Sequence, residues 1–261
     1  MIEFVKELWG SRYALQSQFY VNIKTTVATT RLGVLWWILD PLFLMLIYYF
    51  VVKVVFDRGG EGYHLFALCG IVTWQAFGRS VNLCTGALTR NAALIKQAPL
   101  PMTVYVIISP VVQVFFYLIG LSIILVWNWD DAGWHSFSIL AVLPVMVLVP
   151  FAIGLFLSVF EVFSRDTGKL VTYLLRFGFY LSPVLYSPDR VYGLEGVPEW
   201  SLALYEINPM VHIITWIRDV LFYGKVLDWS SLMIMLAITL AVIQVGLSFF
   251  RVAAPHLPKR L

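Results

Sequence analysis

Six apolar stretches, each near the roughly 20 residues that a helix needs to cross a bilayer, constrain the fold of this chain more than any other feature. They cover residues 34–56, 65–83, 103–127, 137–160, 170–187 and 229–250. Charged residues make up only 13% of the chain, whereas a soluble domain is about a quarter charged. We therefore expect an all-α membrane protein in which residues 1–261 form a single transmembrane domain with six transmembrane helices.

Residues 1–32 precede the first span and are predicted to form an amphipathic interface helix with a short lead-in. Apolar side chains recur at near-helical spacing between charged ones, namely Ile2, Val5, Trp9, Tyr13, Tyr20 and Ile23. Such a helix lies on the membrane surface or packs against a neighbouring subunit, and the sequence leaves both interpretations open.

The distribution of basic residues between the loops predicts the orientation of the chain. With the N-terminus inside, the inner segments carry eleven basic residues, which are Lys6, Arg12, Lys24, Arg31, Arg90, Lys96, Arg165, Lys169, Arg251, Lys259 and Arg260. The outer segments carry four, which are Arg58, Arg190, Arg218 and Lys225. Because cytoplasmic loops are enriched in lysine and arginine, we expect a multi-pass protein with both termini in the cytoplasm.

Residues 188–228, between the last two spans, are predicted to fold on the outer side as a gate region. Pro183 is expected to end the fifth span, and a helix of about 15 residues, too short to cross a bilayer, follows the loop. Asn208 can cap this helix, Pro209 suits its first turn and Gly224 its end. We expect His212, Thr215 and Asp219 on its polar face. The neighbours Arg218 and Asp219 form a local surface pair or line the gate.

Residues 84–102 form the main inner loop. Asn91 is predicted to cap a short helix that runs through Lys96, and Pro99 and Pro101 are predicted to stop it. The loop is an ordinary connection or a docking element for a partner. In the second case Leu94 and Ile95 would form the apolar contact, with Arg90 and Lys96 as charges at its rim.

Asp40, Arg79 and Arg176 are ionisable residues within the predicted spans, where charge is costly and is by default a functional candidate. Asp40 precedes Pro41 near the inner end of the first span, and it marks a pore or gate or a structural kink. Arg79 faces a channel or pairs with a neighbouring helix. Arg176 extends to the membrane interface or faces a channel.

Aromatic residues amount to 16% of the chain, and many near span ends suit the interfacial belts of membrane proteins. Others are candidates for lining a path through the membrane, namely Trp36, Trp37, Trp74, Phe77, Tyr180 and Tyr186. Aromatic planes contact the apolar faces of sugars without holding one sugar tightly, which would suit a substrate that slides.

The sequence contains no G-x-x-x-x-G-K-[ST] phosphate loop, no H-E-x-x-H motif and no cysteine–histidine cluster. We therefore expect no catalytic site, no metal and no cofactor in this chain, and no nucleic-acid partner. Cys69 and Cys84 lie within apolar segments and are predicted to be small core residues.

Four strings in order carry a family resemblance: RLGVLWWILDP (31–41), NAALIKQAPLP (91–101), FYLSPVLY (179–186) and NPMVHIITWIRDVLFYG (208–224). Together they resemble the membrane (permease) subunit of bacterial ABC polysaccharide exporters, most of all the capsular branch, and they are similar to O-antigen export permeases. The resemblance covers essentially the whole chain.

The resemblance implies a half-transporter in the bacterial inner membrane. Its expected partners are a second copy of the chain, two copies of a separate ATPase subunit that binds ATP and Mg, a polysaccharide or glycolipid substrate, and periplasmic and outer-membrane export components. The inner loop would then receive force from the ATPase. Three alternatives remain: an ABC exporter of a small lipid or drug, a membrane-bound enzyme acting on lipid-linked sugars, and a secondary transporter, whose inverted repeats are not evident here.

Overall fold

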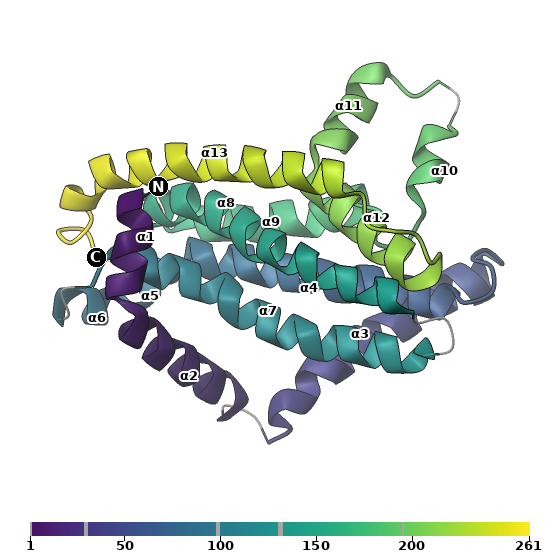
Figure 1. Cartoon of the computed structure of the whole chain (residues 1–261), viewed down its shortest axis with the longest axis horizontal. Coiled ribbons are helices and arrows are strands. Elements are labelled where there is room, and N and C mark those ends of the chain that lie inside the picture. Colours follow the sequence, from purple (N-terminus) through teal and green to yellow (C-terminus); the bar gives the residue numbers. More distant parts are fainter. Residues whose placement is uncertain (1, 29–30, 98–99, 130–132, 195) are drawn as a thin grey trace.

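The computed structural model describes residues 2–28, 31–97, 100–129, 133–194 and 196–261, and within these ranges it contains helices and no strands (Figure 1). The helices are α1 (Ile2–Gly10), α2 (Arg12–Ala28), α3 (Trp36–Tyr49), α4 (Tyr63–Thr85), α5 (Ala87–Arg90), α6 (Ala92–Gln97), α7 (Met102–Trp127), α8 (Leu143–Phe163), α9 (Asp166–Leu181), α10 (Pro188–Tyr192), α11 (Glu199–Ile207), α12 (Pro209–Phe222) and α13 (Trp229–Ala253). A π-helical turn, Phe50–Val55, continues α3, and a 3₁₀ helix, Trp134–Val142, leads into α8.

Four helical segments within the described ranges are long and apolar enough to cross a membrane: Gly33–Val55, Met102–Trp127, Ser136–Phe163 and Trp229–His256. They correspond to the predicted first, third, fourth and sixth spans. In place of the other two predicted spans lie α4, with 23 residues, and α9, with 16. The chain is thus an all-helical multi-pass membrane protein.

Helix α9 stops at Leu181, two residues before Pro183, which was predicted to end the fifth span, and the helix therefore does not reach the predicted bound at residue 187. Ser182 has extended backbone angles (φ −97°, ψ 153°), as expected for a residue that precedes a proline. The apolar residues that follow Pro183 continue the hydrophobic run without continuing the helix.

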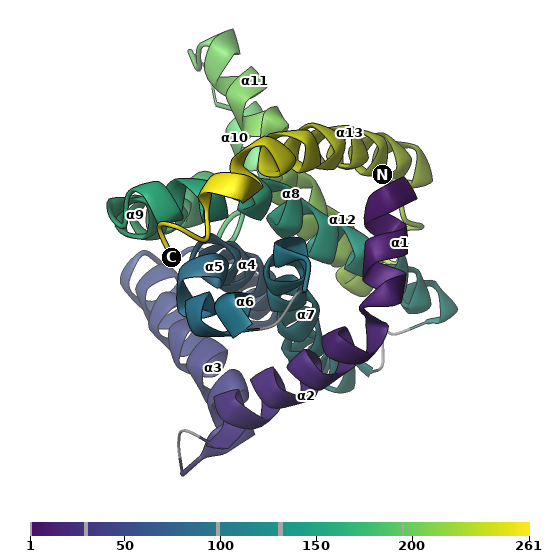
Figure 2. The same cartoon turned by 90° about the vertical axis from the view of Figure 1, so that its left-hand side faces the viewer.

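Helix α4 lies at the centre of the bundle and contacts α3, α7, α8, α9 and α12 (Figure 2). Most of its residues are buried, and small ones allow close approach of its neighbours. A Cβ atom on Gly70 would lie 2.4 Å from the carbonyl oxygen of Val184, so this position needs glycine. Residues of α4 also line the groove beside α3 and α9 that is described below.

Both termini lie at one end of the bundle together with α1, α5 and α6, while α12 and the loop after α3 lie toward the other end (Figure 1). Phe4 of α1 stacks on Phe151 of α8 with ring centres 5.4 Å apart. Arg251 of α13 forms an ion pair with Glu3 at 2.8 Å. These contacts attach α1 to the end of the bundle.

The N-terminal region forms two helices where the sequence predicts one. The break falls at Ser11, directly after Gly10, whose flexibility weakens a helix. One side of α2 packs against α7 through Leu15, Phe19, Ile23 and Val27, with Ile108, Val112 and Phe116 opposite. Tyr13 and Tyr20 on α2 remain exposed. The predicted stop of the inner helix at Pro99 lies outside the described residues.

Candidate functional site

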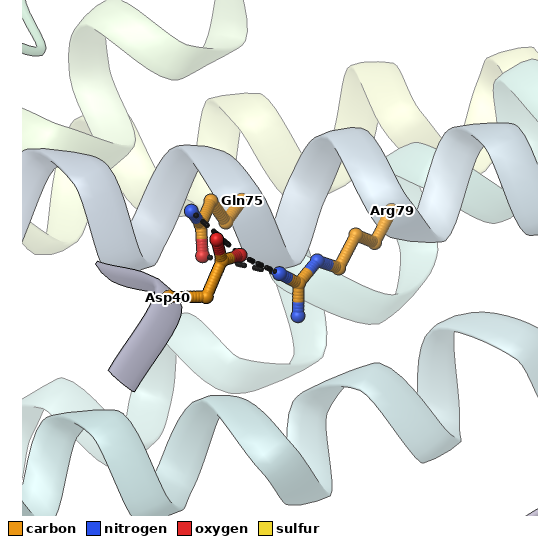
Figure 3. Close-up of polar contacts among 3 residues, drawn as sticks. All are labelled: Asp40, Gln75 and Arg79. Carbon is orange, nitrogen blue, oxygen red and sulfur yellow. Dashed lines mark hydrogen bonds and ion pairs between the residues drawn. The ribbon is translucent and has the colours of Figure 1, made fainter. Parts of the chain in front are cut away.

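An ion pair joins the first half of α3 to the second half of α4, where a guanidinium nitrogen of Arg79 donates to Oδ2 of Asp40 (Figure 3). Gln75, one turn before Arg79 on α4, donates to the same carboxylate oxygen at 3.3 Å. The side chains stay partly exposed, Arg79 to 33% and Asp40 to 44%. Arg79 was predicted either to face a channel or to pair with a neighbouring helix. The structure shows the pairing, and both side chains of the pair remain partly exposed at the surface of the single chain.

Trp37 supports this ion pair from the α3 side. The guanidinium carbon of Arg79 lies 4.4 Å from the centre of the Trp37 ring, a cation–π contact. The Trp37 ring stacks on Phe116 of α7, with centres 4.0 Å apart and planes at 6°. The planar guanidinium is thus oriented by a ring that is itself fixed by α7, an arrangement that lysine would not reproduce.

A groove of about 440 Å³ opens beside the ion pair, between α3, α4 and α9. Its lining residues are Leu44, Tyr48, Trp74, Gln75, Gly78, Arg79, Asn82, Thr172, Leu175, Arg176, Phe179 and Tyr180. The hydroxyl groups of Tyr48 and Tyr180 lie 3.2 Å apart and link α3 to α9. The hydroxyl of Thr172 donates to Oδ1 of Asn82 at 3.2 Å and links α9 to α4. The groove is therefore lined by aromatic side chains and by polar side chains of α4.

Arg176 differs from Arg79 because it lines the groove without a carboxylate in ion-pair distance among the residues that the structure describes. It is exposed, and its guanidinium carbon lies 5.6 Å from the ring centre of Tyr173. Its charge is thus free to meet an anionic group that enters the groove.

The structure brings together some of the predicted path residues and separates others. Trp74, Arg79, Arg176 and Tyr180 line the groove, with Trp37 and Asp40 beside it. Phe77 is buried in the core, and Trp36 is exposed elsewhere on α3. Tyr186 lies in a different cavity, near Tyr63 and Arg190.

Other residues of the groove were not predicted from the sequence, mainly Tyr48, Gln75, Asn82 and Phe179. One signal was available, since Gln75, Arg79 and Asn82 are spaced at three to four residues and so share a face of α4. Polar residues on one face of an apolar span indicate a surface that is not turned toward lipid.

At the other end of the molecule, the predicted signals of the outer helix are confirmed in α12. Oδ1 of Asn208 accepts a hydrogen bond from the backbone N–H of Met210 at 3.0 Å, and Pro209 occupies the first turn. Gly224 adopts a φ of +60° just after the helix, a conformation that glycine adopts freely. His212, Thr215 and Asp219 line one cavity of about 500 Å³, so they share a face as predicted.

The interpretation of Arg218 and Asp219 as a local pair is wrong. Asp219 accepts a hydrogen bond from Lys225 at 2.9 Å, which raises the pKa of Lys225. Arg218 is buried and donates to four backbone carbonyl oxygens, those of Pro183 (2.5 Å), Val184 (2.6 Å), Phe66 (2.9 Å) and Tyr186 (3.3 Å).

Arg218 thereby supports the chain that leaves α9. The backbone at Pro183, Val184 and Tyr186 is not helical, so the carbonyl oxygens need partners from elsewhere in the fold. These four hydrogen bonds compensate for the burial of the guanidinium charge. We name this arrangement, Arg218 with the carbonyl groups of 66, 183, 184 and 186, the arginine clamp.

The inner loop forms two short helices, α5 and α6, rather than one. Asn91 lies just before α6 as predicted, but its side chain does not cap that helix. Its Nδ2 group donates backward to the carbonyl of Ala87 at 2.8 Å, because the end of α5 offers a free acceptor there. The guanidinium of Arg90 donates to the carbonyl of Leu83. Leu94 and Lys96 are exposed, and Ile95 is half-buried.

Residues 13–222, about four fifths of the chain, match the model of a family described as ABC-2 type transporter. The chain belongs to the ABC-2 type transporter membrane family. An O-antigen export system permease protein, RfbA, of Klebsiella pneumoniae is 27% identical over 241 residues, covering 88% of this chain and 87% of the relative.

Two further relatives of this ABC-2 type chain extend the comparison. The RfbA permease of Myxococcus xanthus is 26% identical over 254 residues, and 96% of each chain is covered. The polysialic acid transport protein KpsM of Escherichia coli is 21% identical over 248 residues, covering 92% of this chain and 93% of the relative. The family resemblance is thus confirmed, while the preference for its capsular branch is not supported by these identities.

Proposed function

We propose that this chain is the membrane subunit of an ATP-driven exporter that moves a lipid-linked cell-surface polysaccharide across the bacterial inner membrane. Two copies would assemble with two copies of an ABC ATPase subunit. The observation that carries the proposal is the match to permeases of polysaccharide exporters over about nine tenths of the chain. Membership of a transporter family argues against an enzyme acting on lipid-linked sugars.

In this proposal the chain crosses the membrane six times, with α4 and α9 as the second and fifth crossings. At 1.5 Å per residue, the 23 residues of α4 extend about 35 Å, enough for a hydrocarbon core of about 30 Å. The 16 residues of α9 extend only about 24 Å. The non-helical residues 182–187 complete this crossing. The arginine clamp satisfies three of their carbonyl groups, those of 183, 184 and 186, where water would be absent.

The groove between α3, α4 and α9 is the surface that we assign to the substrate path. Large apolar side chains on α3 and α9 stay exposed in the single chain, including Phe43, Leu46, Phe177 and Tyr180. A second copy placed against this face would enclose a conduit with aromatic walls. Arg176 supplies a charge for an acidic sugar, and the cavity of His212, Thr215 and Asp219 would form the outer gate.

The end that carries α5, α6 and both termini would face the cytoplasm and the ATPase. Leu94 is exposed beside Lys96 on α6, as expected for a small apolar contact with a charged rim. ATP and Mg would bind to the ATPase, and periplasmic and outer-membrane components would receive the polysaccharide. Contacts between this end and the ATPase would couple nucleotide binding by the ATPase to a change between two conformations of the conduit.

The proposal is tested by measuring ATP hydrolysis by the purified chain, by its ATPase partner and by the complex of both in liposomes. We expect hydrolysis only when the ATPase is present, and stimulation of the complex by lipid-linked polysaccharide. Stimulation by small lipids or drugs but not by the polysaccharide would favour the alternative exporter class and overturn the substrate assignment.

The docking assignment is tested with Leu94→Ala combined with Lys96→Glu. We expect this chain to lose co-purification with the ATPase, because both the apolar contact and the rim charge are removed. Lys169→Glu serves as the matched control, since Lys169 is an exposed basic residue at the start of α9. Unchanged co-purification of the double variant would remove the assignment.

A further inference from the structure

A second groove, distinct from the candidate path, runs between α8 and α13 and has a cavity volume of about 500 Å³. Its walls are apolar, with Val149 and Ile153 from α8 and Ile234, Ile238 and Val242 from α13. Residues of α11 and α12 close its outer end, among them Glu206 and His212. The proposed export mechanism does not use the apolar walls of this groove, although His212 at its outer end also lines the cavity assigned to the gate.

The position of the groove determines what surrounds it. Both α8 and α13 belong to segments that are long and apolar enough to cross a membrane. Ile234 and Ile238 are exposed at 61% and 59%, so the groove opens sideways from the bundle and not into its core. Figure 2 shows α13 on a different side of the bundle from α3. In the bilayer this opening faces hydrocarbon.

The length of the groove matches one leaflet. From Ser231 to Val242 the groove follows α13 for 11 residue steps, which is about 17 Å at 1.5 Å per residue. Half of a hydrocarbon core of about 30 Å is about 15 Å. An acyl chain that enters beside Ile238 therefore has its headgroup at the level of Glu206, His212 and Ser231.

The polar end of the groove accepts hydrogen bonds and carries negative charge. Glu206 contributes a carboxylate, and no lysine or arginine lines the groove within the described part of the chain. The hydroxyl of Ser231 donates to Oδ2 of Asp228 at 2.5 Å, so its own oxygen is left as an acceptor. The backbone carbonyl of Glu206 contacts Nε2 of His212 at 2.8 Å, which holds the ring at the rim.

We propose that this groove binds one membrane phospholipid with a primary-amine headgroup, of the phosphatidylethanolamine class. One of its two acyl chains lies between α8 and α13, and its ammonium group meets the carboxylate of Glu206. A charge-assisted hydrogen bond of this kind requires N–H donors, which a quaternary choline lacks. An anionic glycerol headgroup is repelled by the same carboxylate. The proposal depends on the membrane placement of α8 and α13 and not on the exported substrate.

The test measures phospholipid retained by the purified full chain after detergent washing, using native mass spectrometry. The probes are nanodiscs that contain phosphatidylethanolamine, phosphatidylcholine or phosphatidylglycerol with identical acyl chains. We expect one retained phosphatidylethanolamine per wild-type chain. Glu206→Gln is expected to reduce the preference for phosphatidylethanolamine over phosphatidylglycerol about tenfold, since it removes the charge and leaves the shape.

A second variant tests the apolar part of the groove. Ile238→Trp fills the space between α8 and α13 and is expected to abolish retention. Val245→Trp is the matched control on the exposed surface of the same helix, where Val245 is 62% exposed, and it is expected to retain the lipid. Equal retention in both tryptophan variants, or no dependence on the headgroup, would overturn the proposal. Efficient disulfide cross-linking of two copies through Ile238→Cys would also overturn it, because the groove would then be a protein interface.

Discussion

Arg79 and Arg218 are both arginines within an apolar bundle, but the fold uses them in opposite ways. Arg79 pairs with the carboxylate of Asp40 and is one third exposed, at the edge of the α3–α4–α9 groove. Arg218 is 2% exposed and has only carbonyl oxygens as its close hydrogen-bond partners. The first charge is neutralised by another charge, and the second is stabilised by dipoles.

This difference implies that the Asp40–Arg79 ion pair can break and reform during function, whereas the contacts of Arg218 must persist. An ion pair with access to solvent breaks and reforms at small cost, because water replaces either partner. A buried guanidinium that satisfies several carbonyl groups has no such substitute, since each carbonyl left without a donor is penalised. We therefore assign function to the surroundings of Arg79 and stability to the arginine clamp.

The largest effect is expected from Arg218→Met, which removes the clamp and keeps an apolar side chain of similar length. We expect the free energy of unfolding to fall on the order of 3–5 kcal/mol, because buried carbonyl groups lose their donors. Thermal unfolding in detergent measures this. Arg190→Met, on the exposed part of α10, is the control and should change stability by less than about 0.5 kcal/mol. Similar stability of the two variants would show that the clamp is dispensable.

Gly70→Ala is expected to follow, with a loss of about 1–3 kcal/mol from overpacking. The new methyl group would meet the carbonyl oxygen of Val184 at 2.4 Å and Nη2 of Arg218 at 2.6 Å, so the clamp itself would have to move. Gly60→Ala is the matched control, since no atom lies within 4 Å of a Cβ there. The difference between their unfolding midpoints is the measurement, and equal midpoints would contradict the packing at Gly70.

A double-mutant cycle of Asp40→Asn and Arg79→Gln should give a smaller coupling, of about 1 kcal/mol or less, because both groups are partly exposed. Export by the reconstituted complex should nevertheless fall in either single variant. A coupling energy of about 3 kcal/mol or more by thermal unfolding would show that Arg79, like Arg218, mainly stabilises the fold, and would contradict the distinction between the two arginines.

The smallest effect on stability is expected from Arg176→Gln, within about 0.5 kcal/mol, because the exposed guanidinium has no carboxylate partner in the described structure. Stimulation of ATP hydrolysis by an acidic polysaccharide should decrease, and most strongly at low salt, where charges are least screened. Arg165→Gln, outside the groove, provides the control. Equal stimulation of both variants would remove Arg176 from the substrate path.

Sequence patterns predicted the features that depend on neighbouring residues. The cap at Asn208, the proline at 209 and the glycine at 224 fix the ends of α12 through contacts a few residues apart. The span predicted at 103–127 is matched by α7, since 26 residues of high hydropathy have few alternatives in a membrane.

Features that depend on distant residues could not be predicted. Asp40 and Arg79 are 39 residues apart, and Arg218 reaches Phe66 across 152 residues. Pro183 predicted the end of α9 to within two residues, but the support of the apolar residues that follow it could not be predicted. Hydropathy stays high through Val184 and Leu185, and distant donors, Arg218 and the hydroxyl of Tyr63, satisfy the carbonyl groups of the apolar segment that leaves the helix there.

The most direct test of the account is export through a groove that is blocked chemically. Thr172→Cys places a thiol in the α3–α4–α9 groove, and Val245→Cys places one on the outer surface of α13, while the native Cys69 and Cys84 are buried. Vesicles that contain each variant and the ATPase are treated with a bulky thiol reagent and assayed for ATP-dependent export of lipid-linked polysaccharide. We predict that the reagent stops export by Thr172→Cys and spares Val245→Cys. Undiminished export by fully labelled Thr172→Cys would contradict the assignment of the groove to the substrate path.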